Sequence, residues 1–181
     1  MANNAKNIVY FDLETQKSFD EVGGRNKMRD LLMSVGVTFS TASNSYEIFD
    51  ERRVNDLVRT LLRADLVVGF NVLGFDYEVL AHYTLFDLRQ VPTLDLMADI
   101  EKTLGRRIGL DALAAATLGC EKTAEGLQAV RWFKEGKLME IAEYCCYDVK
   151  ITRLLHEYGR ERGQVFYVDK LGQRRAVPVK W

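Results

Sequence analysis

The order of the apolar segments constrains this chain more than any other feature. Three short segments rich in β-branched and aromatic residues come first, at residues 8–13, 31–40 and 46–49. Three such segments in succession predict an antiparallel meander of strands. Segments with apolar residues at helical spacing then alternate with further short apolar runs. This order predicts a mixed sheet covered by helices, an α/β or α+β layer fold.

The later elements follow from the same patterns. Residues 66–70 and 92–96 are short and apolar, which favours two more strands. Apolar residues recur at helical spacing in several other segments, and Gly119 follows one of them as a suitable helix end. We expect these helices at residues 54–63, 75–83, from about 97 to 104, 110–118 and 138–160.

The length of the chain suits a single domain. Its 181 residues can bury a core without metal or disulfide support, so we assign residues 1–181 to one domain with its core at about 8–160. Two short apolar runs flank Leu171-Gly172 and predict a C-terminal β-hairpin within residues 165–181. An apolar fraction of 48% and a charged fraction of 28% exclude a collagen, a coiled coil and a disordered chain. A net charge of −1 excludes a histone-like binder of nucleic acid, although a local basic patch can still bind it.

The three cysteines indicate a reducing compartment. Cys145 and Cys146 are adjacent, Cys120 is alone, and none has the Cys-x-x-Cys spacing of a zinc site. The polar N-terminus lacks the apolar stretch of a signal peptide. No run approaches the roughly 20 apolar residues that span a bilayer. We therefore expect a cytoplasmic protein without a membrane partner.

Two carboxylates lie at the end of the first predicted strand. Asp12 and Glu14 are two residues apart, so both side chains point to the same face of the sheet. Like charges this close repel one another unless a cation lies between them, and Mg²⁺ and Mn²⁺ prefer carboxylate oxygens. The alternative is a strand that simply runs out into solvent.

Other acidic residues also fall beside apolar segments. Asp76 begins a predicted helix, where it either faces the same site or only stabilises the helix N-terminus. Tyr144 and Asp148 are four residues apart and lie within the apolar arc of the long helix. A buried Asp must be paired or bound to metal, so a salt bridge to an arginine is the alternative for Asp148. Tyr144 alone would be an ordinary core tyrosine.

Taken in order, these residues resemble the DEDD superfamily of 3′–5′ exonucleases, which have a ribonuclease H-like fold. The matching residues are Asp12, Glu14 and Thr15 for the first motif, Asn71, Phe75 and Asp76 for the second, and Tyr144 and Asp148 for the third. Glu143 stands where the histidine branch of the superfamily would have His, so the chain resembles the tyrosine branch. Residues 110–119 also resemble bacterial helicase-associated ribonuclease H-like nucleases, and residues 144–152 resemble family B polymerase proofreading domains.

The resemblance implies a metal-dependent 3′–5′ exonuclease that releases nucleoside 5′-monophosphates from DNA or RNA. Two divalent cations, Mg²⁺ or Mn²⁺, would activate water and stabilise the charge on the phosphate. The resemblance implies that Asp12 bridges both ions, that Glu14 and Asp148 hold the ion carrying the attacking water, and that Asp76 acts on the other through water. Tyr144 would orient the water, because a phenol with a pKa near 10 is a poor base at neutral pH.

Candidates for substrate binding are less specific. The resemblance places Leu13 near the terminal base, and Thr15, Asn71 and Phe75 are the other candidates. Six basic residues could contact phosphates, although a solvated face is the favoured interpretation for Arg25, Lys27, Arg29, Arg106, Arg107 and Lys122. Other residues are expected to be structural: Asp95 as a strand-end or helix-start carboxylate, with support of the site as the alternative, Trp132 and Phe133 in or near the core, and His82 and His156 at the surface.

The expected partner is a nucleic acid with a free 3′ end, single-stranded by preference, and a helicase or another nucleic-acid-processing protein is a further candidate. The near-neutral charge predicts weak, distributive binding. Two alternatives remain from the sequence. One is a non-catalytic module on the same fold that binds nucleic acid or a helicase, and the other is a structure-specific endonuclease.

Overall fold

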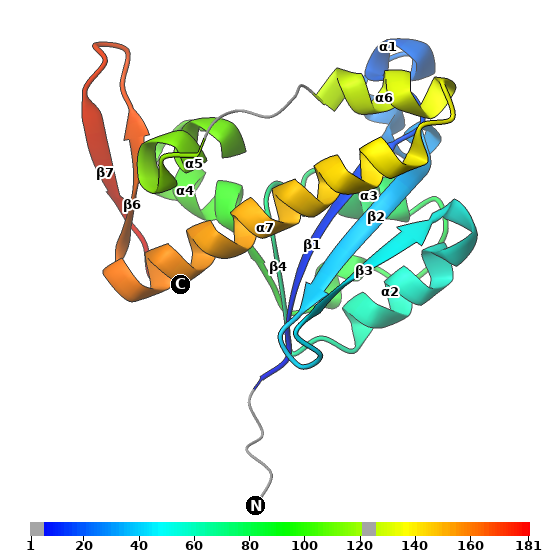
Figure 1. Ribbon diagram of the computed structural model, residues 1–181, viewed down its shortest axis with the longest axis horizontal. Helices are drawn as coiled ribbons and strands as arrows, with labels where there is room; N and C mark the ends of the chain where they lie inside the picture. The colour runs from blue at the N-terminus through cyan, green and yellow to red at the C-terminus, as the bar shows by residue number, and fades with distance from the viewer. Residues whose placement is uncertain (1–5, 121–125) are drawn as a thin grey trace, which may run out of the picture.

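A five-stranded mixed sheet forms the centre of the protein (Figure 1). The computed structural model describes residues 6–120 and 126–181. The strands are β1 (Ile8–Thr15), β2 (Met33–Ser40), β3 (Ser45–Asp50), β4 (Leu66–Gly69) and β5 (Thr93–Asp95), in the spatial order β3-β2-β1-β4-β5. The first three pair antiparallel, and β4 and β5 extend the sheet in parallel from β1. The predicted meander and the mixed sheet are therefore confirmed.

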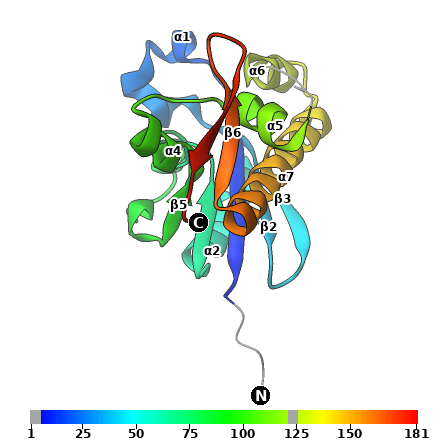
Figure 2. The same ribbon diagram turned by 90° about the vertical axis from the view of Figure 1, so that its left-hand side faces the viewer.

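Helices cover both faces of this sheet (Figure 2). On one face lie α4 (Leu96–Leu104), α5 (Leu110–Leu118), α6 (Gly126–Lys134) and α7 (Leu138–Arg162); on the other lie α1 (Phe19–Val22), α2 (Val54–Leu62) and α3 (Asp76–Leu80). The alternation of β1 explains this division, because Tyr10 packs under α7 while Val9 and Phe11 pack on the opposite face. In the described ranges 6–120 and 126–181, no helix is long and apolar enough to cross a membrane.

The segment between β1 and β2 differs most from the prediction. A 3₁₀ helix occupies Arg25–Leu31, and Leu32 has a φ of 56°, so β2 begins at Met33 rather than at residue 31. The four-residue helix α1 precedes this segment and is too short to show a helical apolar period. Its start is stabilised by Glu21, whose Oε2 accepts a hydrogen bond from the Ser18 backbone N–H at 2.9 Å. The sequence analysis also missed α6.

The predicted C-terminal hairpin is confirmed. It consists of β6 (Gln164–Val168) and β7 (Arg174–Pro178) and forms a separate two-stranded sheet beside α5. The Phe166 backbone N–H donates to Thr117 Oγ1 at 2.9 Å, which ties β6 to α5. Beyond β7, the indole of Trp181 packs so closely on α7 that a Cβ at Gly159 would lie 2.4 Å from it. A side chain at that position would therefore displace the C-terminus.

The prediction that both histidines lie at the surface is wrong for His156. Its side chain is only 2% exposed, and its Nδ1 lies 2.9 Å from the Tyr10 hydroxyl. Burial, with a smaller contribution from the nearby charge of Arg160, lowers the pKa of His156 to about 4. The imidazole is therefore neutral at pH 7 and satisfies a buried phenol, a structural role that the sequence pattern did not reveal.

Candidate metal centre

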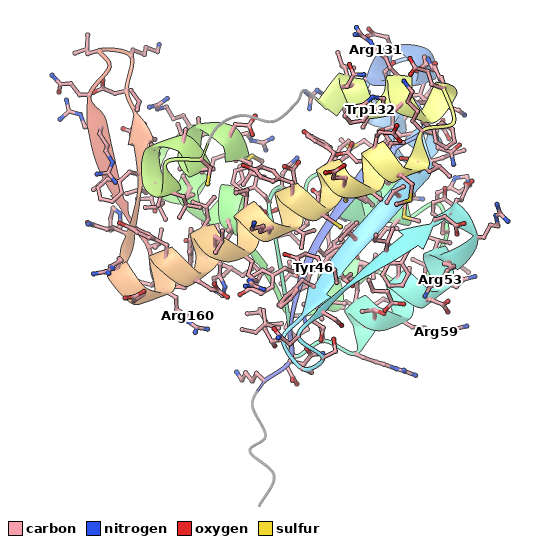
Figure 3. All side chains as sticks on the ribbon, viewed as in Figure 1. Tyr46, Arg53, Arg59, Arg131, Trp132 and Arg160 are labelled. Carbon is pink, nitrogen blue, oxygen red and sulfur yellow. The ribbon has the colours of Figure 1, made fainter. Side chains whose placement is uncertain are left out.

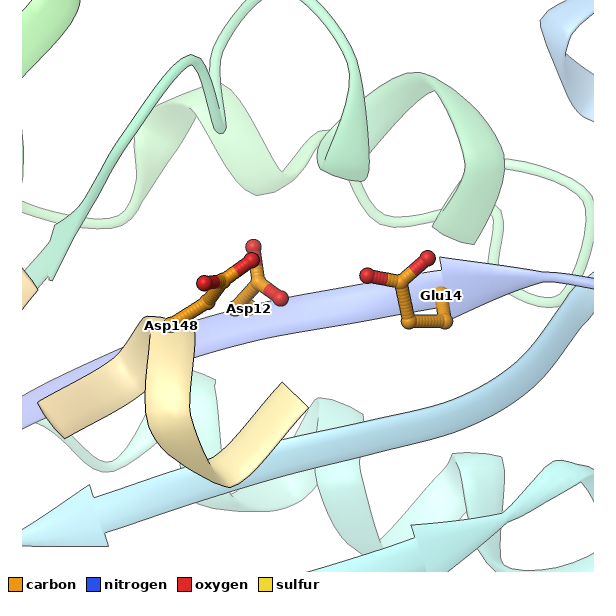
Figure 4. A group of neighbouring side chains, drawn as sticks. All are labelled: Asp12, Glu14 and Asp148. Atoms are coloured by element: carbon orange, nitrogen blue, oxygen red, sulfur yellow. The ribbon is translucent and has the colours of Figure 1, made fainter. Parts of the chain in front are cut away.

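Three carboxylates from two elements meet on the face of the sheet that α7 covers. Asp12 and Glu14 point to this face from β1, because two residues is one strand period. Asp148 approaches them from α7, and one carboxylate oxygen of each of the three residues lies within 4.8 Å of the others (Figure 4). All three side chains are half-buried. The strand therefore does not run out into solvent, and the predicted group of acidic residues is brought together.

The fourth predicted carboxylate lies next to this group but outside it. Asp76 is the first residue of α3, and its side chain is only 3% exposed. Because β4 pairs with β1 only as far as Tyr10, the backbone N–H of Leu13 is free to donate to Asp76 Oδ1, at 3.1 Å. Asp76 thus begins a helix and also lies beside the acidic group.

Burial, with repulsion from nearby carboxylates, raises the pKa of every member of this cluster. Burial, followed by the charges of the neighbouring carboxylates, holds the pKa of Asp12 and of Glu14 well above the usual range. Burial raises the pKa of Asp76 to about 8. Burial, then the charge of Asp111, raises that of Asp148 to about 7. Each of these carboxyl groups is thus buried beside at least one other carboxylate.

No cationic side chain in the described part of the chain compensates these acids. Every ion pair there joins other residues, so the buried salt bridge considered for Asp148 is not formed. A cluster of oxygen ligands without a partner cation fits a hard divalent ion such as Mg²⁺ or Mn²⁺. Such an ion would lower the pKa of each carboxyl again and stabilise the ionised cluster.

A cavity of about 360 Å³ lies beside the carboxylates. All four candidate substrate-binding residues, Leu13, Thr15, Asn71 and Phe75, line it together with Asp12, Glu14 and Asp76. The sequence analysis missed the remaining walls. Lys17 and Phe19 reach the cavity from the segment after β1, and Leu127 and Val130 reach it from α6.

Asn71 is placed by a carboxylate outside the metal centre. Its backbone has a φ of 67°, and its N–H donates to Asp95 Oδ1 at 2.9 Å. Asp95 also accepts a hydrogen bond from the Leu73 backbone and caps α4 through the backbone N–H of Met97. The interpretation of Asp95 as a helix-start carboxylate is thus correct. Asp95 also shapes the loop that carries Asn71.

Tyr144 lies one helical turn before Asp148 and is half-buried rather than a core residue. Its ring packs edge-on against Trp132, with ring centroids 6.3 Å apart. Burial, then the charges of Asp148 and Glu14, raise the pKa of Tyr144 far above that of an ordinary phenol. Hydrogen bonding from Tyr144 in turn lowers the pKa of Asp148. The phenol stays protonated at neutral pH, so it can donate a hydrogen bond but cannot act as a base.

Cys145 is a neighbour of the metal centre that the sequence analysis did not assign to it. Its Sγ lies 3.3 Å from Asp12 Oδ2 and 3.4 Å from the Asp12 carbonyl oxygen. Burial raises the pKa of the Cys145 thiol, so it remains a neutral donor to the carboxylate. The signal was available, because Cys145 lies three residues before Asp148 and therefore on the same face of the helix.

None of the predicted basic residues in the described part of the chain forms an ion pair with these acids. Arg25, Lys27 and Arg29 are exposed on the 3₁₀ helix, where Arg25 stacks on the ring of Phe19 at 4.8 Å. Arg107 is paired with Glu101. Lys122 lies outside the described residues.

Comparisons with known proteins place this geometry in context. A family model described as the RNase_H superfamily matches residues 9–159. The chain is also similar to a family B DNA polymerase from the hyperthermophilic archaeon Pyrobaculum calidifontis, with a TM-score of 0.62 and 18% sequence identity. That match covers 85% of this chain but 24% of the polymerase, so the chain spans about a quarter of that protein. No curated protein matches this sequence.

Proposed function

Because the chain belongs to the RNase H superfamily, we propose that it is a metal-dependent 3′–5′ exonuclease of the tyrosine branch of the DEDD superfamily. Its substrate is a DNA or RNA strand with a free 3′ end, and its products are nucleoside 5′-monophosphates. The observation that carries this proposal is the group Asp12, Glu14 and Asp148, which has no compensating cation among the described residues and opens beside a cavity. We treat residues 1–181 as one domain, with the hairpin as an appendage of the catalytic core.

The mechanism assigns a role to each side chain of the site. Asp12, Glu14 and Asp148 would hold divalent ions, with Asp76 completing the set, and two such ions supply an activated water and charge stabilisation at the phosphate. The neutral phenol of Tyr144 orients the attacking water by donating a hydrogen bond. Cys145 keeps the Asp12 carboxylate in place through its thiol.

The cavity supports the predicted position of the terminal nucleotide. Leu13 and Phe75 offer apolar surface to a base, and Asp12, Glu14 and Asp76 line the same cavity. Asn71 offers an amide at the edge of the cavity. The free thiols of Cys120, Cys145 and Cys146 fit the reducing cytoplasm expected from the sequence. A helicase or another processing protein would hold a long strand on an enzyme that itself binds weakly.

A labelled strand tests the proposal. Single-stranded DNA and RNA labelled at the 5′ end are incubated with Mn²⁺, Mg²⁺ or EDTA, using the wild type, Asp12→Asn and Asp56→Asn. We expect a metal-dependent ladder that shortens from the 3′ end, lost in Asp12→Asn but kept in Asp56→Asn, whose partly exposed carboxylate pairs with Arg59 on α2. A blocked 3′ end should stop cleavage.

Each alternative gives a different pattern. Cleavage of the strand with the blocked 3′ end would establish an endonuclease. Binding of the strands without cleavage, and without any binding of Mn²⁺, would establish a non-catalytic binding module. Equal cleavage by the wild type and Asp12→Asn would refute the assignment of the site.

A further inference from the structure

The charge of the chain is unevenly distributed along the sequence. Residues 160–181 carry six basic and two acidic side chains, a net charge of +4. The other 159 residues carry 19 basic and 24 acidic side chains, a net charge of −5. The near-neutral total therefore conceals a cationic C-terminal end, which carries the hairpin.

Two guanidinium groups are held on the hairpin by aromatic rings. The Arg174 guanidinium lies 3.6 Å from the ring centroid of Phe166, and the Arg106 guanidinium lies 4.8 Å from that of Tyr167. Because Phe166 and Tyr167 are consecutive in β6, their rings point to opposite faces of the hairpin. Arg174 is further fixed by its Nε, which donates to the Ala116 carbonyl oxygen at 2.8 Å. Both faces of the hairpin thus carry an ordered positive charge.

These two cations and Lys170 at the turn form what we call the hairpin surface. All three side chains are exposed, and within residues 6–120 and 126–181 none of them has an ion-pair partner. Their neighbours are neutralised, because Arg175 pairs with Asp169 and Arg107 pairs with Glu101. The turn projects beyond α5 in both views (Figures 1 and 2). Unpaired cations on and beside a projecting ribbon, two of them held by aromatic rings, are suited to an extended polyanion.

Helix α5 connects this surface to the metal centre. Helix α5 packs against α7, which carries Asp148, and Asp111 in the first turn of α5 acts electrostatically on that carboxyl. At the C-terminal end of α5, Ala116 and Thr117 hold the hairpin by hydrogen bonds. Five residues of helix separate Asp111 from Ala116, a rise of about 8 Å. A strand with its 3′ end at the carboxylates would therefore reach the hairpin within a few nucleotides.

We propose that the hairpin surface, Arg106, Lys170 and Arg174, binds the phosphate backbone of a nucleic-acid strand upstream of its 3′ end. The metal centre then takes the terminal nucleotide while the hairpin holds the body of the strand. The inference rests on the proposed function where it is tested by cleavage of a strand. The measurement of DNA binding tests it independently of that function.

Binding is measured first, on the full chain carrying Asp12→Asn, in EDTA, with a fluorescein-labelled single-stranded DNA over a series of NaCl concentrations. The test variant combines Arg106→Gln, Lys170→Gln and Arg174→Gln. These substitutions remove three positive charges and leave a polar, unbranched side chain at each position. Since each phosphate contact contributes about 0.7 to the salt slope of a single strand, we expect the slope to become shallower by about 2 and the affinity to fall about tenfold.

The matched control removes the same charge elsewhere. Arg52→Gln, Arg59→Gln and Arg63→Gln alter exposed residues around α2, and Figure 3 shows Arg59 on the side of the molecule away from Arg160 and the hairpin. We expect the control to keep the wild-type salt slope. The single variant Lys170→Glu changes an exposed turn residue and cannot disturb the core, and we expect it to weaken binding about threefold.

Cleavage separates this inference from the proposed function. The p-nitrophenyl ester of thymidine 5′-monophosphate reaches only the metal centre, so the hairpin variants should hydrolyse it at the wild-type kcat/KM and show a raised KM only for long strands. If the wild type fails to hydrolyse any substrate, the proposed function is wrong. The binding data then still test whether the hairpin surface binds the strand. If the triple variant and Lys170→Glu bind DNA with wild-type affinity and slope, the inference is overturned.

Discussion

Two buried polar groups join the same strand to the same helix, and they are opposite in character. At what we call the histidine end, Tyr10 of β1 and His156 of α7 share a hydrogen bond of 2.9 Å. Two turns earlier in α7, at the acidic end, Asp148 meets Asp12 and Glu14 of β1. Tyr10 and His156 satisfy each other's hydrogen-bonding groups, whereas the three carboxylates repel one another. A buried polar pair with complementary partners stabilises the fold, and a buried group of like charges needs a ligand.

Removing a charge from the acidic end should separate activity from stability most strongly. We expect Asp148→Asn to lower kcat by at least about a thousandfold, since it removes a metal ligand. In EDTA the same variant should be more stable than the wild type, because the repulsion among the carboxylates is relieved. Cleavage rates and urea unfolding in EDTA measure both. A variant that loses activity and stability together would show that Asp148 acts in folding.

The pH dependence of stability in EDTA should also distinguish the two ends. The folded-state pKa of Asp76 is raised to about 8 and that of Asp148 to about 7, above their unfolded values near 4. The folded state therefore binds more protons, and stability should be lost as pH rises from about 4 through 8.

This loss is measured as the difference in unfolding free energy between the wild type and Asp76→Asn at pH 5 and pH 8. The amide retains an oxygen that can accept from the Leu13 backbone, so the variant is a matched comparison. We expect saturating Mn²⁺ to abolish the difference. If the wild type instead gained stability relative to the variant between pH 5 and pH 8 in EDTA, the predicted sign of the pH dependence would be wrong.

Tyr144→Phe tests the neutral phenol at the acidic end, to which the proposed mechanism gives the role of orienting the attacking water. We expect kcat to fall about a hundredfold and KM to change little, because the phenol orients the attacking water rather than binding the substrate. The rate should show no titration of a phenol, since the pKa of Tyr144 lies far above the working range. A wild-type kcat would remove Tyr144 from the mechanism, and Tyr147→Phe on the same helix serves as the control.

The histidine end should give the smallest effect, with the opposite sign. The folded-state pKa of His156 is lowered to about 4 from 6.5, so the unfolded state binds more protons as pH falls. Stability should therefore be complete above about pH 6.5 and fall by about 2 kcal/mol between pH 7 and pH 5. The unfolding free energy of the wild type minus that of His156→Gln measures this loss. A difference independent of pH would show that His156 is not the titrating group.

The acidic end was predictable from the sequence, and the histidine end was not. Asp12 and Glu14 stand out because charges interrupt an apolar strand, and Asp148 stands out because an acid lies in an apolar arc. A histidine in a long charged helix carries no such signal, since its burial depends on Tyr10, which is 146 residues away in the sequence. Contacts between segments that are distant in the sequence determine whether such a residue is buried, and the local sequence pattern does not show these contacts.

The walls of the cavity illustrate the same limit. Phe75 and Asn71 were found because they lie beside a motif residue. Phe19 reaches the cavity from α1, which is too short to show an apolar period, and Leu127 reaches it from α6, which the sequence analysis missed. The strands and long helices were predicted well because their apolar periods extend over many residues. The segment from Arg25 to Leu32 was misassigned because a 3₁₀ helix and a positive φ leave no periodic trace.

The central claim is that the acidic end is a site for a divalent cation. Titration of Mn²⁺ into the wild type, Asp148→Asn and His156→Gln, followed by the electron paramagnetic resonance signal of free Mn²⁺, tests it most directly. The account predicts that the wild type and His156→Gln bind Mn²⁺ and that Asp148→Asn loses this binding. Equal binding by all three proteins, or no binding by the wild type, would contradict it.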